Sequence, residues 1–223
     1  MMDWAALLLS LKLAVLTTLL LVPLAVLLAR PLAWSRFAGK GLLEALVALP
    51  LVLPPTVLGY YLLTAFASHA PIGRAYAALT GRTLVFSFDG LLLASLIFNL
   101  PFAVQPIQRA FGGIPRAARE AAWCCGLSSW RTLWRVELPL AWPGLLSAIV
   151  LTFAHTLGEF GVVLMVGGNI SEQTRTVAIS IYDRMQAFDE SGVAAMSALL
   201  VGISFSAIGA FHLLTRRIGH HEG

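Results

Sequence analysis

Residues 4–29 read WAALLLSLKLAVLTTLLLVPLAVLLA and carry a single charge, that of Lys12. A helix needs about 20 mostly apolar residues to cross the hydrocarbon core of a bilayer. The segment is too long for the apolar core of a secretory signal peptide, which has about 7–15 residues, and it lacks a convincing small-residue cleavage site. We therefore expect a retained transmembrane helix, with the long stem of Lys12 reaching the lipid headgroups.

Four further segments have the same apolar character: residues 43–66, 90–111, 141–166 and 193–214. Hydrophobic residues make up 58% of the 223-residue chain and charged residues 12%, whereas soluble domains have about 45–50% and about 25%. The mean hydropathy is +0.83. The sequence thus predicts an all-α transmembrane bundle of about five spans, forming one domain over residues 1–223, and excludes ordinary soluble enzyme folds.

Basic residues are distributed unevenly between the loops. Ten lie in segments 30–42 and 109–137 and in the tail after the fifth span, whereas four lie in the loops on the other side. Because cytoplasmic loops carry the excess of Lys and Arg, we expect the N-terminus outside and the C-terminus in the cytoplasm. The net charge of +4 then reflects orientation in the membrane, and no nucleic-acid partner is expected.

Prolines interrupt two of the predicted spans. The second contains Pro50, Pro54 and Pro55, and the third contains Pro101 and Pro106. An interior proline removes a backbone hydrogen bond, which a membrane tolerates only where protein or a water-lined cavity satisfies the freed carbonyl. Broken helices near the midplane predict a transport path, and simple packing kinks are the alternative.

Residues 114–144 read IPRAAREAAWCCGLSSWRTLWRVELPLAWPG and lie on the predicted cytoplasmic side. Pro115 suits the first turn of a helix and Gly126 the position just past its end, while Ser128 or Ser129 can cap a second helix. Small side chains at helical spacing, among them Ala121, Ala122 and Cys125, allow another surface to approach closely. We expect a helix–turn–helix that docks a soluble partner, with both cysteines as small packing residues.

This loop resembles the EAA motif of ABC importer permeases. The resemblance is carried by Glu120-Ala121-Ala122, Gly126, Leu138-Pro139 and Pro143-Gly144. It implies an ABC importer type I permease fold in which the loop over residues 114–144 holds a coupling helix that sits in a cleft of an ATPase subunit. The ATPase-coupling residues that it implies are Arg119, Glu120, Ala121, Ala122 and Gly126.

Two other stretches resemble molybdate permeases (the ModB type). They are LPLVLPPTVLGY at residues 49–60, and LGEFG at residues 157–161 followed by Gly168-Asn169-Ile170 and Thr174-Arg175-Thr176. His155 departs from the pattern, since members often carry arginine before GEFG. The resemblance implies a homodimer in a bacterial inner membrane, two cytoplasmic ATPase subunits that use ATP and Mg, and a periplasmic or extracellular oxyanion-binding protein.

The sequence contains no ATPase motif of its own. A P-loop needs GxxxxGK[ST], but the single Gly-Lys pair is Gly39-Lys40 and position 34 is Trp. Motifs of serine hydrolases and zinc proteases are also missing from the sequence. We therefore expect a chain that is not itself an enzyme, with no catalytic residues and no resident metal.

The expected translocation path or gate combines the broken second span with polar groups in the third and fourth spans. Its candidate residues are Pro54, Pro55, Thr56, Asn99, His155 and Glu159, and Gln105 is a further polar donor near the third span. His155 and Glu159 are spaced i, i+4 and can pair, either as a gate or as a structural pair that orders the following turn.

Several alternatives remain open from the sequence. The cargo is molybdate or, in the same machine, tungstate or sulfate/thiosulfate, while a different class of protein is an ATP-independent channel or secondary carrier. Segment 158–192 either contains a re-entrant piece or does not. Within it, Val177, Ile181, Met185 and Phe188 recur at helical spacing, which predicts a short amphipathic helix at the outer membrane surface.

Overall fold

The computed structural model describes residues 2–219, with side chains through Ser206, and the regular elements of this part are all helical. The helices are α1 (Trp4–Trp34), α2 (Lys40–Val52), α3 (Pro55–Phe66), α4 (Pro71–Thr80), α5 (Phe88–Phe98), α6 (Leu100–Gly112), α7 (Arg116–Cys124), α8 (Ser129–Thr132), the π-helix η1 (Leu133–Glu137), α9 (Leu138–Leu140), α10 (Trp142–Gly158), α11 (Gly161–Gly167), α12 (Val177–Gln186) and α13 (Glu190–Gly219). The expectation of an all-α fold is confirmed.

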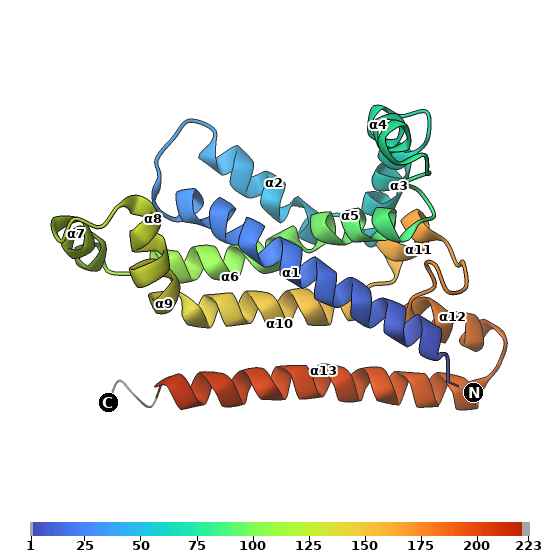
Figure 1. Cartoon of the computed structure of the whole chain (residues 1–223). Helices are drawn as coiled ribbons and strands as arrows, with labels where there is room; N and C mark the ends of the chain where they lie inside the picture. Colours follow the sequence, from blue (N-terminus) through green and yellow to red (C-terminus); the bar gives the residue numbers. More distant parts are fainter. Residues whose placement is uncertain (1, 220–223) are drawn as a thin grey trace.

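The chain runs back and forth along the long dimension of the molecule (Figure 1). One end holds α7, α8 and α9, and we call it the α7 end; the other holds α4, α11 and α12, and we call it the α4 end. Helix α1 runs from the α4 end to the α7 end, α2 and α3 return, α5 and α6 go forward again, α10 returns, and α13 runs forward below α10.

The predicted spans correspond to these long elements, but the number of five is not confirmed. Helix α1 and the continuous segment Phe88–Gly112 are long and apolar enough to cross a membrane alone. The pairs Lys40–Val52 with Pro55–Phe66 and Ser129–Leu140 with Trp142–Gly158 qualify only as bent spans. In α13 the apolar part within the described side chains is the shorter stretch Glu190–Ser206.

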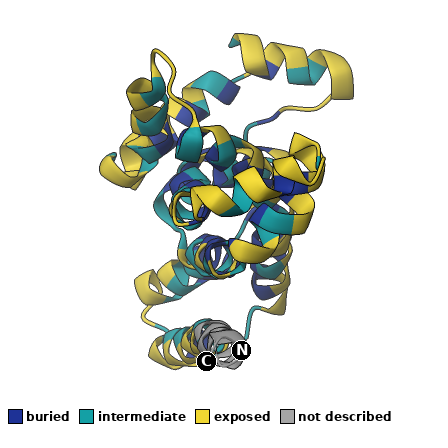
Figure 2. Cartoon of the chain, turned by 90° about the vertical axis from the view of Figure 1, so that its left-hand side faces the viewer, coloured by how far each residue is buried: buried dark blue, intermediate teal, exposed yellow. Residues whose placement is uncertain are grey.

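Helix α1 begins at a capped residue and is apolar on both faces. The Oδ1 of Asp3 accepts a hydrogen bond from the backbone N–H of Ala6 at 3.0 Å, which satisfies one free amide of the first turn. Leu13, Leu21 and Ala29 are buried, while Leu8, Leu19, Leu20 and Leu27 on other faces are exposed. Figure 2, viewed from the α7 end, shows buried residues where helices meet and exposed residues on outward faces.

The two proline-containing spans behave differently. Between α2 and α3 the chain bends by 112°, because Leu53 and Pro54 are extended (ψ 135° and 137°), as expected before a proline. In the third span Asn99 stays in the helical region (φ −86°, ψ −6°), and Pro101 lies in the first turn of α6, where its missing N–H costs little. The expected break is thus found in the second span, whereas the third continues from Phe88 to Gly112.

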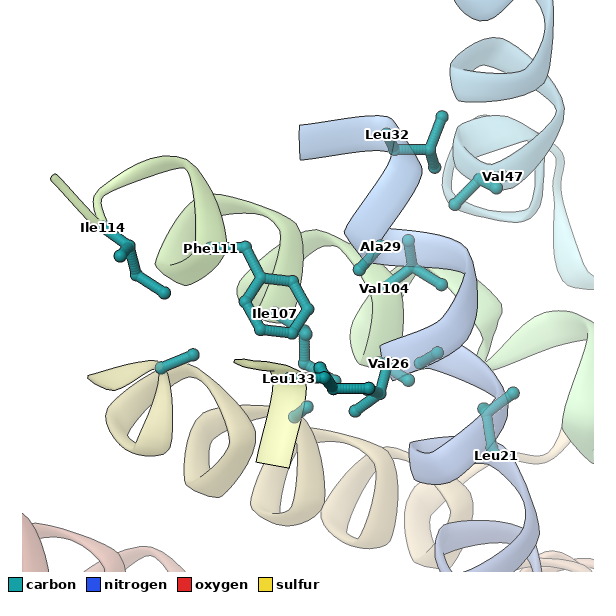
Figure 3. Close-up of a cluster of buried hydrophobic side chains, with 14 residues drawn as sticks. Leu21, Val26, Ala29, Leu32, Val47, Val104, Ile107, Phe111, Ile114 and Leu133 are labelled. Carbon is teal, nitrogen blue, oxygen red and sulfur yellow. The ribbon is translucent and has the colours of Figure 1, made fainter. Parts of the chain in front are cut away.

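The core at the α7 end lies between α1, α6 and α10. Its buried side chains include Leu21, Ala29, Ile107 and Phe111, and α2 adds Val47 at the edge (Figure 3). Helix α10 approaches α6 very closely at Gly144, where an added Cβ would lie 2.3 Å from the Ala110 Cβ and 2.7 Å from the Pro106 oxygen. Close packing therefore explains the glycine of the Pro143-Gly144 pair, since no larger residue fits at this helix crossing.

A second core at the α4 end joins α3, α5 and α11, with Val162, Val163 and Val166 buried. The predicted fourth span, 141–166, is wrong at its far end. Helix α10 stops at Gly158 because Glu159 is extended (φ −72°, ψ 132°), and α11 forms a separate short helix. Gly161 allows the start of α11 to pack closely against α3, since an added Cβ would lie 2.7 Å from the Pro55 Cβ.

The predicted amphipathic helix is present as α12, but its packed face differs from the predicted one. Val177 and Ile179 are buried, whereas Met185 and Phe188 are 63% and 91% exposed. Phe188 lies past the end of α12 at φ +57°, so the helical spacing no longer applies to it. Asp189 directly precedes α13. Hydrogen bonds from the Gly192 backbone and from Ser191 and Arg184 lower the pKa of its carboxyl.

Candidate coupling helix and translocation path

Helix α7 has the boundaries that the sequence predicts. Pro115 precedes its first residue, and Gly126 beyond its end has φ +78°, the left-handed conformation that glycine adopts without strain. The Oγ of Ser128 accepts a hydrogen bond from the Arg131 backbone N–H at 3.4 Å and caps α8. The expected helix–turn–helix is confirmed, and it projects from the α7 end of the molecule (Figure 1).

The outward face of α7 has no covering within the described part of the chain. Ala117, Glu120 and Ala121 are exposed, and the free thiols of Cys124 and Cys125 are exposed as well. The Nε of Arg116 lies 2.7 Å from the Glu120 Oε1, an exposed i, i+4 pair of small energetic value. Both cysteines are thus exposed in the single chain, and their role as small packing residues on a surface that another protein approaches stays a prediction.

The predicted coupling residues divide between two faces. Glu120, Ala121 and Gly126 are exposed, whereas Ala122 is buried and Arg119 is half-buried. The Nε of Arg119 lies 3.2 Å from the Glu137 Oε1, and its guanidinium stacks 3.6 Å from the centre of the Trp34 ring. Arg119 therefore points toward the body of the chain.

The sequence reasoning missed Glu137. Its side chain is fully buried, and its Oε2 lies 2.8 Å from the Arg30 Nε. The available signal was a lone acidic residue directly before Leu138-Pro139, next to apolar residues on both sides. Charged side chains are almost never fully buried unless they are paired, so the residue required a basic partner that spacing alone did not identify.

At the break between α2 and α3, the path candidates are open to the outside. Pro54, Pro55 and Thr56 are all exposed, as are the neighbouring Leu51 and Val52. The bend leaves an apolar surface around it that no other described segment covers. This surface is available to lipid or to another protein chain.

Behind the break, Asn99 connects the third and fourth spans. Its Nδ2 donates to the Ser95 carbonyl oxygen and to the Thr156 Oγ1, both at 2.9 Å. Its Oδ1 lies 3.0 Å from the His155 Nδ1. Because an amide oxygen can only accept a hydrogen bond, the His155 Nδ1 is the donor. The His155 ring stacks on Phe102 with 4.0 Å between the ring centroids.

The predicted pairing of His155 with Glu159 is not formed. Glu159 lies beyond the end of α10, so the helical i, i+4 geometry does not apply to it. Its Oε1 instead accepts a hydrogen bond from the Val162 backbone N–H at 2.9 Å, in the first turn of α11. Both side chains nevertheless reach the same cavity.

This cavity has a volume of about 200 Å³. Its lining includes Pro50, Pro55, Phe98, Phe102, His155 and Glu159. Three of the six path candidates, Pro55, His155 and Glu159, thus meet there, and Asn99 orients one of them from behind. Pro54 and Thr56 do not line it.

A second hollow of about 520 Å³ lies between α2 and α6, nearer the α7 end. Its polar lining residues are Lys40, Glu44, Gln105, Gln108 and Arg109. Glu44 accepts from the Gln108 Nε2 at 2.8 Å and lies 3.9 Å from the Lys40 Nζ. Positions 98 and 102 line the first cavity, and positions 105 and 109 line the second hollow. These positions share one face of the continuous helix Phe88–Gly112, so this face borders both spaces.

The sequence pattern of one protein family matches residues 21–220, nearly the whole described chain. Its description is "Binding-protein-dependent transport system inner membrane component". The chain belongs to this family. The permease is therefore an inner-membrane component of an ABC transporter and not itself an ATPase, as the EAA motif predicts.

One relative of this permease is the "Molybdenum transport system permease protein ModB" of Azotobacter vinelandii, 47% identical over 210 residues, which cover 94% of this chain and 93% of the relative. Another is the "Probable sulfate transport system permease protein cysT" of Zygnema circumcarinatum, 34% identical over 181 residues, which cover 79% of this chain and 62% of the relative. The resemblance to ModB-type permeases is confirmed.

Among solved structures, the permease resembles a bacterial ABC transporter involved in the import of the acidic polysaccharide alginate. The TM-score is 0.77 at 17% sequence identity, over 96% of this chain and 79% of the other. At this identity the likeness concerns the fold alone. It confirms the predicted ABC importer type I permease fold.

Proposed function

We propose that this chain is the membrane-spanning subunit of an ATP-driven importer that carries molybdate across the bacterial inner membrane. The observation that carries the proposal is the 47% identity to a molybdenum transport permease over 94% of the chain. Two copies form the path, two cytoplasmic ATPase subunits supply the energy, and a periplasmic binding protein delivers the oxyanion. The N-terminus lies outside, and the α7 end, with its excess of basic residues, lies in the cytoplasm.

The exposed face of α7 supports an ATPase partner. A helix that projects from the membrane part with Glu120 and Ala121 on an uncovered side offers small side chains for close approach and one carboxylate for an ionic contact. ATP and Mg bind to the partner, because this sequence has no P-loop. Closure of the two ATPase subunits draws the two α7 helices together and opens the path outward.

The cavity at the break supports a path for an anion. A dianion in hydrocarbon costs many kcal/mol unless polar groups replace its water. His155, held by Asn99 through its Nδ1, has its Nε2 available as the other polar atom of the ring. Glu159 repels an anion from the cavity in the closed state, and Gln105, Lys40 and Arg109 attract it onward to the cytoplasm.

The test is uptake of labelled molybdate by cells that lack their own permease and express this chain with its matching ATPase and binding protein. We expect ATP-dependent uptake that a large excess of sulfate does not suppress. Glu120→Arg should abolish uptake while the permease stays in the membrane, because it reverses the charge at the proposed ATPase contact. Uptake that survives Glu120→Arg indicates a channel or secondary carrier instead.

A second readout uses the exposed thiols of α7. Maleimide labelling of Cys124 and Cys125 should be fast in the permease alone and slow in the assembled complex, because the ATPase covers them. Equal labelling rates in the two samples would contradict docking at α7.

The second candidate cargo is sulfate, and the observation in its favour is the 34% identity to a sulfate transport permease. Sulfate, tungstate and molybdate are all tetrahedral dianions, so the permease itself distinguishes them only weakly, and selection against sulfate belongs mainly to the binding protein. Strong competition by sulfate in the same uptake assay would assign this chain to a broader oxyanion importer.

A further inference from the structure

A buried carboxylate joins three separate parts of the chain at the α7 end. The side chain of Glu137, the last residue of η1, is 0% exposed. Its Oε2 lies 2.8 Å from the Arg30 Nε, and its Oε1 lies 3.2 Å from both the Arg30 Nη2 and the Arg119 Nε. Arg30 belongs to α1 and Arg119 to α7, so one carboxylate connects α1 and α7 to the segment that leads into α10.

Each arginine is held by further contacts. The Nη2 of Arg30 donates to the carbonyl oxygen and the Oγ of Ser129, at 3.0 and 2.9 Å, at the start of α8. The Arg119 guanidinium carbon lies 3.6 Å from the centre of the Trp34 ring and 5.1 Å from the centre of the Trp123 ring. The planar guanidinium suits both stacking and ion pairing, so Arg119 is fixed in orientation as well as in position.

The local backbone brings Glu137 to this place. Residues Leu133–Glu137 form a π-helix, a wider turn that is frequently found at functional sites. After the three residues of α9, the chain bends by 76° between Ser129–Leu140 and Trp142–Gly158. Glu137 therefore lies at the joint between the docking hairpin and α10, the helix that carries His155.

Stability alone does not explain this arrangement. A buried ion pair often contributes no more than apolar side chains of the same size, because removing charges from water is expensive. In some proteins such groups specify one geometry, and here a shifted α7 would leave a buried charge without its partner. Helix α7 otherwise packs mainly on α8 and η1, the segments that follow it in the chain.

We infer that Arg30, Glu137 and Arg119 form a clamp through which movement of α7 reaches α1 and α10. Arg119 is then a positioning residue that acts through Glu137, and it does not contact the ATPase. The inference rests on the proposed function, because it concerns how docking at α7 is coupled to the path. Loosening the clamp separates ATP hydrolysis from transport and leaves docking intact.

The first test uses the complete transporter in proteoliposomes and measures molybdate taken up per ATP hydrolysed. For Glu137→Gln, which keeps the shape and removes the charge, we expect ATPase subunits to co-purify normally and the uptake per ATP to fall about tenfold, within the usual range for coupling between sites. Arg135→Gln is the matched control, because Arg135 is exposed two residues away, and it should leave the ratio unchanged. An unchanged ratio for Glu137→Gln overturns the clamp.

A double-substitution cycle tests whether the residues act as one unit. Arg119→Gln should reduce uptake per ATP as Glu137→Gln does, and the double variant should be no worse than either one, because groups that share one interaction are not additive. Arg119→Lys, which keeps the charge, should retain part of the coupling. Fully additive losses would show that Arg119 acts elsewhere, as it would in a direct ATPase contact.

The second test is independent of transport. In the full-length permease with Cys124→Ser, a spin label on Cys125 reports the mobility of α7. Glu137→Gln should increase this mobility, and Arg135→Gln should not. The two failures can be told apart. If the wild-type complex transports molybdate but Glu137→Gln leaves the mobility of the label unchanged, the clamp is wrong and the proposed function stands. If Glu137→Gln increases the mobility of the label but the wild-type complex takes up no oxyanion, the proposed function is wrong instead. Should Glu137→Gln fail to assemble, Glu137→Asp, which shortens the reach by one methylene, replaces it in both tests.

Discussion

Asn99 shows how much one buried amide can organise in this protein. The side chain is fully buried and makes three contacts, to the Ser95 carbonyl, the Thr156 hydroxyl and the His155 ring. Two of these partners come from α10, more than fifty residues away in the sequence. The amide thus holds the third and fourth spans in register and turns His155 toward the cavity at the break.

Replacing this amide tests the role at the residue scale. Asn99→Leu keeps the volume but leaves the His155 Nδ1 without its acceptor, and an unsatisfied buried group costs about 1–3 kcal/mol. We expect a lower melting temperature of the purified permease and a loss of molybdate uptake beyond that explained by protein level. Thr156→Val, which removes one of the two α10 partners and leaves His155 in place, should cost stability but retain more uptake. Equal uptake by Asn99→Leu and the wild type would contradict a path through this cavity.

At the scale of elements, glycines decide how closely the helices cross. Gly144 lets α10 lie against the Pro106 backbone and the Ala110 side chain of α6, and Gly161 lets α11 lie against Pro55. Small residues at helix crossings are common in membrane proteins, where packing rather than the hydrophobic effect drives helix association. The α6–α10 contact then fixes the position of His155 relative to the third span.

Gly144→Ala should separate these two helices. The new Cβ would meet the Ala110 Cβ at 2.3 Å and the Pro106 oxygen at 2.7 Å, and overpacking of this kind costs about 1–3 kcal/mol. Gly202→Ala in α13 is the matched control, because an added Cβ there meets nothing within 4 Å. The substitution also removes the entropic penalty of a glycine inside a helix. Thermal unfolding should therefore occur earlier for Gly144→Ala and at the same or a higher temperature for Gly202→Ala; the opposite order would be inconsistent with the crossing.

At the scale of the whole molecule, a single chain leaves its proposed path open on one side. The break between α2 and α3 is bordered by apolar residues that are strongly exposed, Val52 at 79% and Tyr61 at 61%. A path for a dianion needs walls on all sides, since lipid provides no hydrogen bonds. A second copy that covers this surface would close the path, as the proposed homodimer requires.

Val52→Gln should therefore weaken the dimer. The substitution places an amide in the apolar surface between copies, and we expect mass measurements in nanodiscs to change from two permease chains to one. Leu19→Gln on the exposed face of α1 is the control, since that face is expected to contact lipid, and its complex should keep two chains. A wild-type complex with one permease chain would exclude the homodimer.

The sequence predicted the elements well where a local rule applied. Pro54 and Pro55 predicted the break in the second span, because an interior proline prevents helical hydrogen bonding at a known position. Pro115 and Gly126 predicted the two ends of α7 for equally local reasons, and the pair Ser128 and Ser129 predicted the start of α8, where Ser128 is the residue that caps. The end of the fourth span was missed, since apolar residues continue through Val166. The helix ends at Glu159, whose carboxylate accepts from the Val162 backbone, and Gly161 packs closely against Pro55 of α3.

By itself the sequence determined that this chain is a helical membrane protein, where its helices bend, and which loop resembles an EAA coupling helix, because composition, proline positions and short motifs are properties of neighbouring residues. Only the tertiary structure decided which polar groups meet. It paired His155 with Asn99 and left Glu159 to accept from the Val162 backbone. It also placed Glu137 between Arg30 and Arg119, which are 107 and 18 residues away from it. The physical reason is that a buried polar group takes whichever partner the packing of helices brings within about 3 Å, and helix packing depends on every crossing in the bundle at once.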